Sequence, residues 1–191
     1  MFQSFDTEND PTRAAGRIAA LRELMRKRGI DAYLVPRADE HQGEYVPPSS
    51  ERLAWLTGFT GSAGFALVGT DRAALFVDGR YTVQARQQVD TAIIEIVQIP
   101  ARALKDWAFE RLGKDAVIGF DPWLATVQQV VQTRADLAPR GMQFKEIAGN
   151  LVDRIWGKER PSPPAEPVRL HPIAFAGESP EDKIARMQKR L

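Results

Sequence analysis

The chain has 191 residues, in which 26 lysines and arginines stand against 25 aspartates and glutamates. This near-neutral balance argues against a broad nucleic-acid-binding surface, which needs a clear excess of basic residues. The absence of cysteine excludes thiol catalysis, disulfide bonds and cysteine-ligated metals. The first ten residues carry acids and no apolar run, and no segment approaches the roughly 20 apolar residues of a membrane span. We therefore expect a cytoplasmic protein without nucleic-acid or membrane partners.

The first predicted elements are a helix over residues 11–28 and a strand over 32–35. Asp10-Pro11 reads as an N-cap followed by the first helical residue, and Gly29 suits the left-handed conformation that ends many helices. The apolar run that follows predicts a buried strand. This order of helix, tight turn and strand is typical of α/β proteins.

A polar loop then leads to a short predicted helix, which Ser49 or Ser50 should cap. Small residues fill the segment Gly58–Gly64, and its glycine spacing matches neither the dinucleotide fingerprint nor the phosphate loop. We interpret these glycines as sites of close backbone packing where a loop enters a strand. Residues 65–68 and 73–77 predict a hairpin, so the sheet should be mixed rather than purely parallel.

The rest of the body alternates helices and strands. In the helix over 126–137, we expect Val127, Val130, Val131 and Leu137 to face inward. Asp78 should cap the helix that follows it. The predicted segments are a helix over 79–88, a strand over 92–99, a helix over 104–112, a strand over 117–120, the helix over 126–137, a strand over 142–147 and a helix over 151–156.

The composition changes after residue 156, where we place the end of the first domain, residues 1–156. Residues 157–179 form a proline-rich linker, because closely spaced prolines stiffen a chain into an extended conformation. Residues 180–191 open a helix in which Lys183-Ile184-Ala185 repeats the Arg17-Ile18-Ala19 of the first helix. This repeat predicts that residues 180–191 begin a second, truncated domain.

Two groups of polar residues are candidates for chemistry. The first is Asp39-Glu40-His41 with Glu44, which contains metal-ligand types but lacks further ligands converging from rigid elements. A solvated polar loop is the simpler interpretation. The second is Arg80 with Tyr81, which follow a predicted strand, and residues at the carboxyl end of a strand often face a ligand crevice. The alternative for Arg80 is an ordinary solvated surface side chain.

Five segments occur in a recognisable order: DEHQGEYVP at 39–47, GFTGSAG at 58–64, DGRYTVQA at 78–85, GFDP at 119–122 and NLVDRIW at 150–156. Together they resemble the N-terminal domain of the Xaa-Pro aminopeptidase P family, within the creatinase/prolidase superfamily. Gly43 stands where the family usually has serine.

The resemblance implies a longer protein with three domains: this one, a second of similar fold, and a C-terminal catalytic domain. The catalytic domain would carry two divalent metal ions, usually manganese, held by two aspartates, one histidine and two glutamates. These ligands would lie beyond Leu191, so we expect no catalytic residue, metal site or cofactor in this segment. The full-length metallopeptidase would be a hydrolase that releases the residue ahead of a proline by metal-activated water.

We therefore expect a mixed β-sheet flanked by helices that acts as the non-catalytic first domain of an aminopeptidase P. It should restrict access to the active site and support assembly, and its partners should be the missing domains, a second copy in a homodimer, and peptides with proline in second position. The candidate substrate-cleft residues are Arg80, Tyr81, His41 and Tyr45. The alternatives are a histone-chaperone-like or other non-enzymatic relative, which would lack the metal ligands, and a free-standing α/β binding domain.

Overall fold

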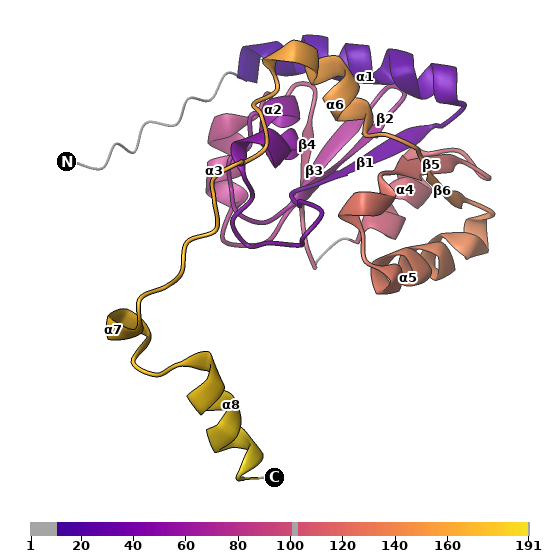
Figure 1. The fold of residues 1–191 in the computed structure, drawn as a ribbon. Coiled ribbons are helices and arrows are strands. Elements are labelled where there is room, and N and C mark those ends of the chain that lie inside the picture. Colours follow the sequence, from indigo (N-terminus) through magenta and orange to yellow (C-terminus); the bar gives the residue numbers. More distant parts are fainter. Residues whose placement is uncertain (1–10, 101–102, 191) are drawn as a thin grey trace.

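The computed structural model describes residues 11–100 and 103–190. Their body is a six-stranded sheet between two layers of helices, and a long tail leaves it (Figure 1). In chain order the elements are α1 (Ala14–Arg28), β1 (Ala32–Pro36), α2 (Arg52–Thr57), β2 (Phe65–Gly69), β3 (Ala73–Val77), α3 (Thr82–Gln88), β4 (Glu95–Gln98), α4 (Leu104–Arg111), β5 (Val117–Phe120), α5 (Val127–Leu137), β6 (Gln143–Glu146), α6 (Leu151–Trp156), α7 (Ile173–Ala176) and α8 (Pro180–Gln188).

The strand order is β4-β3-β2-β1-β5-β6, and β2 runs antiparallel to both of its neighbours. β1 is parallel to β5, β5 to β6, and β3 to β4. The predicted mixed sheet and the hairpin of β2 and β3 are therefore confirmed. Because five strands share one direction, their carboxyl ends meet at a single edge, which we call the carboxyl edge.

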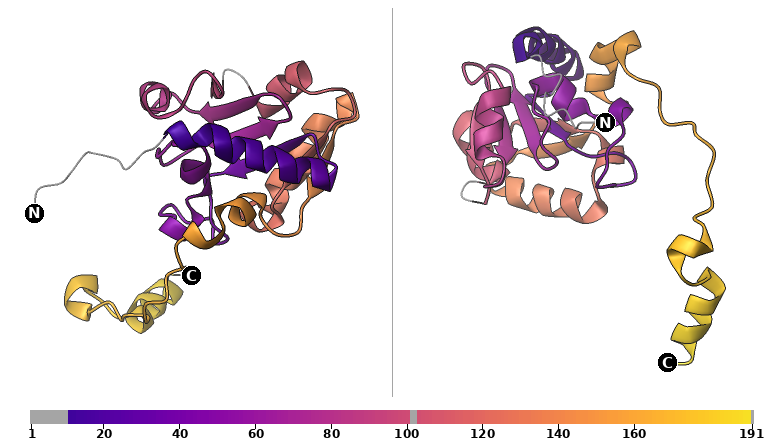
Figure 2. Two further views of the ribbon diagram at one scale, coloured as in Figure 1. Left: turned by 90° about the horizontal axis from the view of Figure 1, so that it is seen from above. Right: turned by 90° about the vertical axis from the view of Figure 1, so that its left-hand side faces the viewer.

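The two faces of the sheet bury different helices, since successive side chains of a strand point to opposite sides. In β1, Tyr33 and Val35 pack with α1, α2, α3 and α6, whereas Ala32 and Leu34 pack with α4 and α5. Figure 2 shows α1 and α6 on one side of the sheet and α5 on the other. The body is thus a three-layer sandwich with a separate apolar core on each face of its sheet.

The start of the chain agrees with the predicted helix and strand. α1 ends at Gly29, whose φ of 60° is left-handed and whose N–H donates to the Arg26 carbonyl. A single 3₁₀ turn, Pro11–Arg13, precedes α1. The predicted cap at Asp10 lies outside the described residues.

Two other predicted helix caps are wrong. Ser49 and Ser50 are buried in a 3₁₀ turn before α2, whose N-cap residue is Glu51. α3 begins at Thr82 rather than at residue 79, with Tyr81 at its N-cap position. The Asp78 carboxylate accepts hydrogen bonds from the backbone and guanidinium of Arg80 instead. Asp78 lies three residues before this N-cap position, so its carboxylate binds the nearby charged donor Arg80 rather than the N–H groups of the helix.

The inward face predicted for α5 is only half right. Leu137 is buried and Val130 is partly buried, but Val127 and Val131 are 82% and 62% exposed. The helix rests on the sheet along one narrow side, so only Val130 and Leu137, seven residues apart, point to the core. Two strands are shorter than predicted: the strand expected over 92–99 is β4, Glu95–Gln98, and the one expected over 142–147 is β6, Gln143–Glu146.

The end of the body is α6, which has the bounds predicted for the helix over 151–156. Trp156 stacks on Trp55 of α2 with 5.1 Å between ring centroids. After the 3₁₀ turn Gly157–Glu159 the chain extends away from the body through α7, which the sequence did not predict, to α8. Among the described residues, no helix has the length and apolar character needed to cross a bilayer.

Tyr33 generates the first prediction. Its buried hydroxyl accepts a hydrogen bond of 3.3 Å from the Leu151 N–H at the start of α6. Burial raises the pKa of Tyr33. Replacing Tyr33 with Phe should cost about 1–3 kcal/mol at neutral pH, because the Leu151 N–H loses its acceptor inside the protein.

This deficit should shrink above about pH 10. The folded state resists ionisation of Tyr33 while the unfolded chain ionises near the ordinary value, so the wild type loses stability as pH rises and the Phe variant does not. Denaturant unfolding between pH 7 and pH 11 measures both effects. The exposed Tyr45→Phe variant is the control, and a deficit that is constant with pH contradicts this account of Tyr33.

Candidate functional site

The predicted site residues all follow strands whose carboxyl ends lie at the carboxyl edge. His41 and Tyr45 lie on the loop after β1, and Arg80 and Tyr81 follow β3. β2 separates these two strands. With strands spaced about 4.8 Å apart, the two pairs of residues start from backbone roughly 10 Å apart. The fold thus places both pairs along one edge, as expected for groups that face a crevice of an α/β sheet.

The loop after β1 has a defined shape. Arg37 donates to the Glu44 carbonyl at 3.0 Å and to the Glu51 carboxylate at 3.4 Å. Burial raises the pKa of Glu51, and the nearby Arg37 guanidinium opposes this shift. These contacts fasten both ends of the loop to one guanidinium, while the side chain of Tyr45 remains 89% exposed.

Asp39 organises the tip of the same loop. Its buried carboxylate accepts the N–H groups of His41, at 3.0 Å, and Gly43, at 2.9 Å. The His41 imidazole is exposed and its Nε2 lies 3.9 Å from Glu40. Within the two described ranges no group of three or more histidines and acids is placed to hold a metal ion. Arg37 and Asp39 thus bind the backbone of the loop, whereas the His41 side chain is exposed.

Arg80 and Tyr81 are brought together. The Arg80 guanidinium lies 5.1 Å from the centre of the Tyr81 ring, and the Tyr81 hydroxyl is 2.5 Å from Ser62. Nε and Nη2 of Arg80 bind the carboxylate of Asp78 at 3.0 Å and 2.7 Å. Hydrogen bonds from Arg80 lower the pKa of Asp78, and the same bonds raise the pKa of Arg80. The two-pronged donor face of Arg80 is therefore already engaged within this chain.

The glycines before β2 are explained by close packing. A Cβ on Gly61 would lie 2.2 Å from the Phe59 ring and 2.8 Å from Tyr81. A Cβ on Gly64 would lie 2.9 Å from the Phe76 carbonyl. These contacts agree with the packing interpretation of the glycine segment, and they show that Gly61 packs against the Tyr81 ring.

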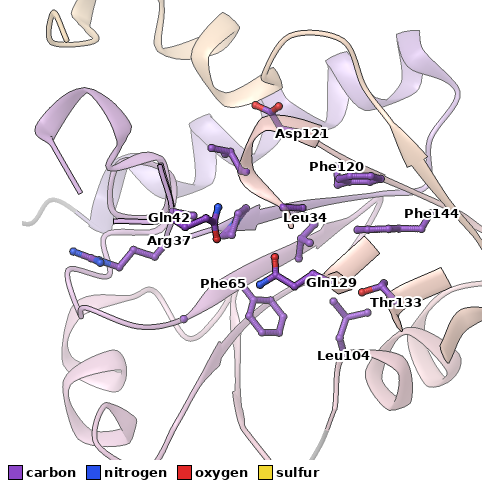
Figure 3. A pocket seen from close by; sticks show the side chains of 15 residues that line it. Leu34, Arg37, Gln42, Phe65, Leu104, Phe120, Asp121, Gln129, Thr133 and Phe144 are labelled. Carbon is purple, nitrogen blue, oxygen red and sulfur yellow. The ribbon is translucent and has the colours of Figure 1, made fainter. Parts of the chain in front are cut away.

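A cavity of about 350 Å³ opens on the α4/α5 face of the sheet near the carboxyl edge (Figure 3). This volume lies within the range of pockets for small molecules. Its walls are mostly apolar, with neutral polar groups from Gln42, Gln129 and Thr133. Figure 3 shows the charged ends of Arg37 and Asp121 turned away from the cavity. The apolar walls come chiefly from Leu34, Phe65, Leu104, Phe120 and Phe144.

This chemistry suits an apolar group rather than acid–base catalysis. None of the candidates His41, Tyr45, Arg80 and Tyr81 lines the cavity. The structure thus arranges them along the same edge as the cavity without gathering them around it.

Sequence reasoning missed an ion pair near this edge, in which the arginine is buried and the aspartate is partly buried. Arg52 is 6% exposed and donates two hydrogen bonds, of 2.7 and 2.9 Å, to the carboxylate of Asp153. No spacing links these residues, because 101 positions separate them. A second contact had a sequence signal: Asn150 donates to Asp121 at 2.8 Å, and these residues belong to two of the five recognised segments.

The family model of the creatinase/prolidase N-terminal domain matches residues 17–155. The chain belongs to this family. The resemblance and the fold class predicted from the five segments are thereby confirmed. Among solved structures, the N-terminal domain of the cytoplasmic peptidase PepQ from Mycobacterium tuberculosis has a TM-score of 0.56 and 25% identity, with 73% of this chain and 98% of that one covered.

Longer relatives match almost the whole chain. The probable Xaa-Pro aminopeptidase P of Ajellomyces dermatitidis is 40% identical over 185 residues, which are 95% of this chain and 30% of the relative. The X-prolyl aminopeptidase of Caenorhabditis elegans, described as a cytosolic enzyme with a di-nuclear active site, has a TM-score of 0.80 and 32% identity. That match covers 93% of this chain and 31% of the nematode protein. The creatinase/prolidase N-terminal domain described here therefore spans less than a third of these relatives.

Gly61 generates the second prediction. Gly61→Ala should destabilise the domain by about 1–3 kcal/mol, because the new methyl group must displace the rings of Phe59 and Tyr81. Thermal or denaturant unfolding measures this loss.

Gly16→Ala is the matched control. Gly16 lies in α1 with nothing within 4 Å of the added methyl group, so this variant should gain up to about 1 kcal/mol from helix propensity. Equal stability of the two variants contradicts the close-packing role of Gly61.

Proposed function

We propose that this chain is the non-catalytic N-terminal domain of an Xaa-Pro aminopeptidase, a metallopeptidase that removes the residue before a proline. The observation that carries the proposal is identity of 32% to 41% over more than nine-tenths of the chain with proteins of that name. Each of these relatives is about three times as long as the matched segment. The reaction chemistry then belongs to the remainder of the longer protein.

The metal requirement agrees with this division of labour. The C. elegans relative is described as having a di-nuclear active site. The polar loop around His41 does not fit a metal centre, because the Asp39 carboxylate is committed to backbone N–H groups and the His41 ring is exposed. The two metal ions, manganese in our proposal, would be held outside this domain and would activate the hydrolytic water there. In our proposal the described residues hold no metal ion and break no bond, and Arg80 acts only from its position in the substrate cleft.

The role of this domain would be to limit access to the active site and to support assembly of a cytoplasmic homodimer. Three features support the proposal that the carboxyl edge is buried against another part of the longer protein. Tyr45 and Trp123 are large side chains that remain exposed on the segments after β1 and β5, and the cavity on the α4/α5 face has mostly apolar walls. Exposed apolar surface of this kind supports a contact surface at this edge. The relatives named above are peptidases, which favours this function over a histone-chaperone-like one.

The third prediction separates this domain from the chemistry. The 191-residue chain, incubated with Mn²⁺ and an Xaa-Pro peptide, should release no N-terminal residue above background and should bind no stoichiometric metal by calorimetry. A longer chain with the catalytic part should do both. Cleavage by the 191-residue chain that survives repurification and disappears in His41→Ala contradicts the assignment.

The fourth prediction concerns Arg80, whose proposed position is in the substrate cleft together with Tyr81, His41 and Tyr45. In the full-length enzyme Arg80→Ala should lower kcat/KM at least about tenfold, which corresponds to about 1.4 kcal/mol of transition-state stabilisation. The melting temperature should change little, because the Arg80–Asp78 pair is exposed.

The control is Arg86→Ala, which removes another exposed arginine nearby on α3. This variant should keep both kcat/KM and melting temperature. Unchanged kinetics in Arg80→Ala would leave Arg80 as a surface residue. A large loss of stability with unchanged kinetics would make its pairing with Asp78 purely structural.

A further inference from the structure

The tail is fastened to the body where it begins. Nε of Arg160 donates to the Ser49 carbonyl at 2.7 Å, and its Nη1 lies 2.9 Å from the Asp153 carboxylate. The same carboxylate holds the buried Arg52. One carboxylate of α6 therefore binds both the start of α2, 101 positions earlier in the chain, and Arg160 at the start of the tail, seven residues later.

The two arginines of this cluster have different depths. Arg52 is buried and needs Asp153, because an unpaired buried charge costs several kcal/mol. Arg160 is only partly covered, with 27% of its side chain exposed. Removing Arg160 leaves the Arg52–Asp153 pair intact. The contact with the tail can thus be broken without breaking the body.

The segment after Arg160 is stiff enough to keep the direction in which the backbone leaves this residue. Arg160 has φ −65° and ψ 125°, the extended conformation that a residue before proline favours. Of the next seven residues, four are prolines: Pro161, Pro163, Pro164 and Pro167. A proline-rich segment is semi-rigid and rises about 3.1 Å per residue, so these seven span about 20 Å.

We propose that Arg160 is a latch that sets the direction in which the polypeptide leaves this domain, and that the stiff segment 161–167 transmits this direction to the following part of the chain. The match to the C. elegans structure supports it. Its coverage of 93% exceeds the share of the chain that precedes Pro161, so the matched residues include part of the tail. The latch rests on the contacts of Arg160 with Ser49 and Asp153 and requires no peptidase activity.

The fifth prediction tests the latch by distance measurement between two spin labels. The chain contains no cysteine, so Gln128→Cys on exposed α5 and Ala165→Cys on the tail give a clean labelled pair. Double electron–electron resonance should give a narrow distance distribution in this parent. Adding Arg160→Ala should at least double the width of the distribution, with the melting temperature of the body nearly unchanged.

Two further variants sharpen the test. Arg169→Ala removes an arginine farther along the tail that pairs with Glu166, and it should leave the distribution narrow. Arg160→Lys keeps the charge but cannot reach both Ser49 and Asp153 with a planar fork, so it should give intermediate width. A broad parent distribution, an unchanged width in Arg160→Ala, or equal broadening in Arg169→Ala would overturn the latch. Each of these outcomes is independent of whether the longer protein is a peptidase.

Discussion

Helix α6 is held against the sheet by buried hydrogen bonds on which the end of the domain depends. The Asn150 side chain accepts the first N–H groups of α6, from Val152 and Asp153, and donates to the Asp121 carboxylate. The Tyr33 hydroxyl accepts the N–H of Leu151 between them. Buried polar groups are tolerated only when they are paired, so this network admits one position of α6 on β1 and β5. The position of α6 in turn fixes the place of Asp153, which binds Arg160 at the start of the tail.

The side chains at the carboxyl edge are of two kinds: buried polar groups that are hydrogen-bonded and large side chains that are exposed. The buried carboxylates of Asp39 and Asp121 accept hydrogen bonds from backbone N–H groups, and Asp121 also accepts one from the Asn150 side chain. Groups that face outward, such as Tyr45 and Trp123, are large, apolar and exposed. The inward-facing carboxylates of this edge are thus paired with hydrogen-bond donors, whereas its large outward-facing side chains are exposed to solvent.

Predictions from the sequence succeeded where a local pattern has one physical solution. Gly29 ends α1 because few other residues adopt its φ, and the run of 65–77 became a hairpin because two apolar segments flank a short polar turn. They failed where neighbours in space competed with neighbours in sequence. Asp78 was predicted to cap a helix, but its carboxylate binds the Arg80 guanidinium. Val127 has the helical spacing of a core residue, but its side chain is exposed.

The sequence by itself determined the α/β class, the mixed sheet, the packing role of the glycine segment and the family, because each rests on periodicity, glycine geometry or ordered segments within the chain. Only the tertiary structure decided that Arg52 and Arg160 share Asp153, that Arg80 is engaged by Asp78, and that neither His41 nor Arg80 lines the cavity. These are contacts between side chains. Their partners are selected by distance after folding, and residues separated by 101 positions carry no trace of that proximity in the order of the chain.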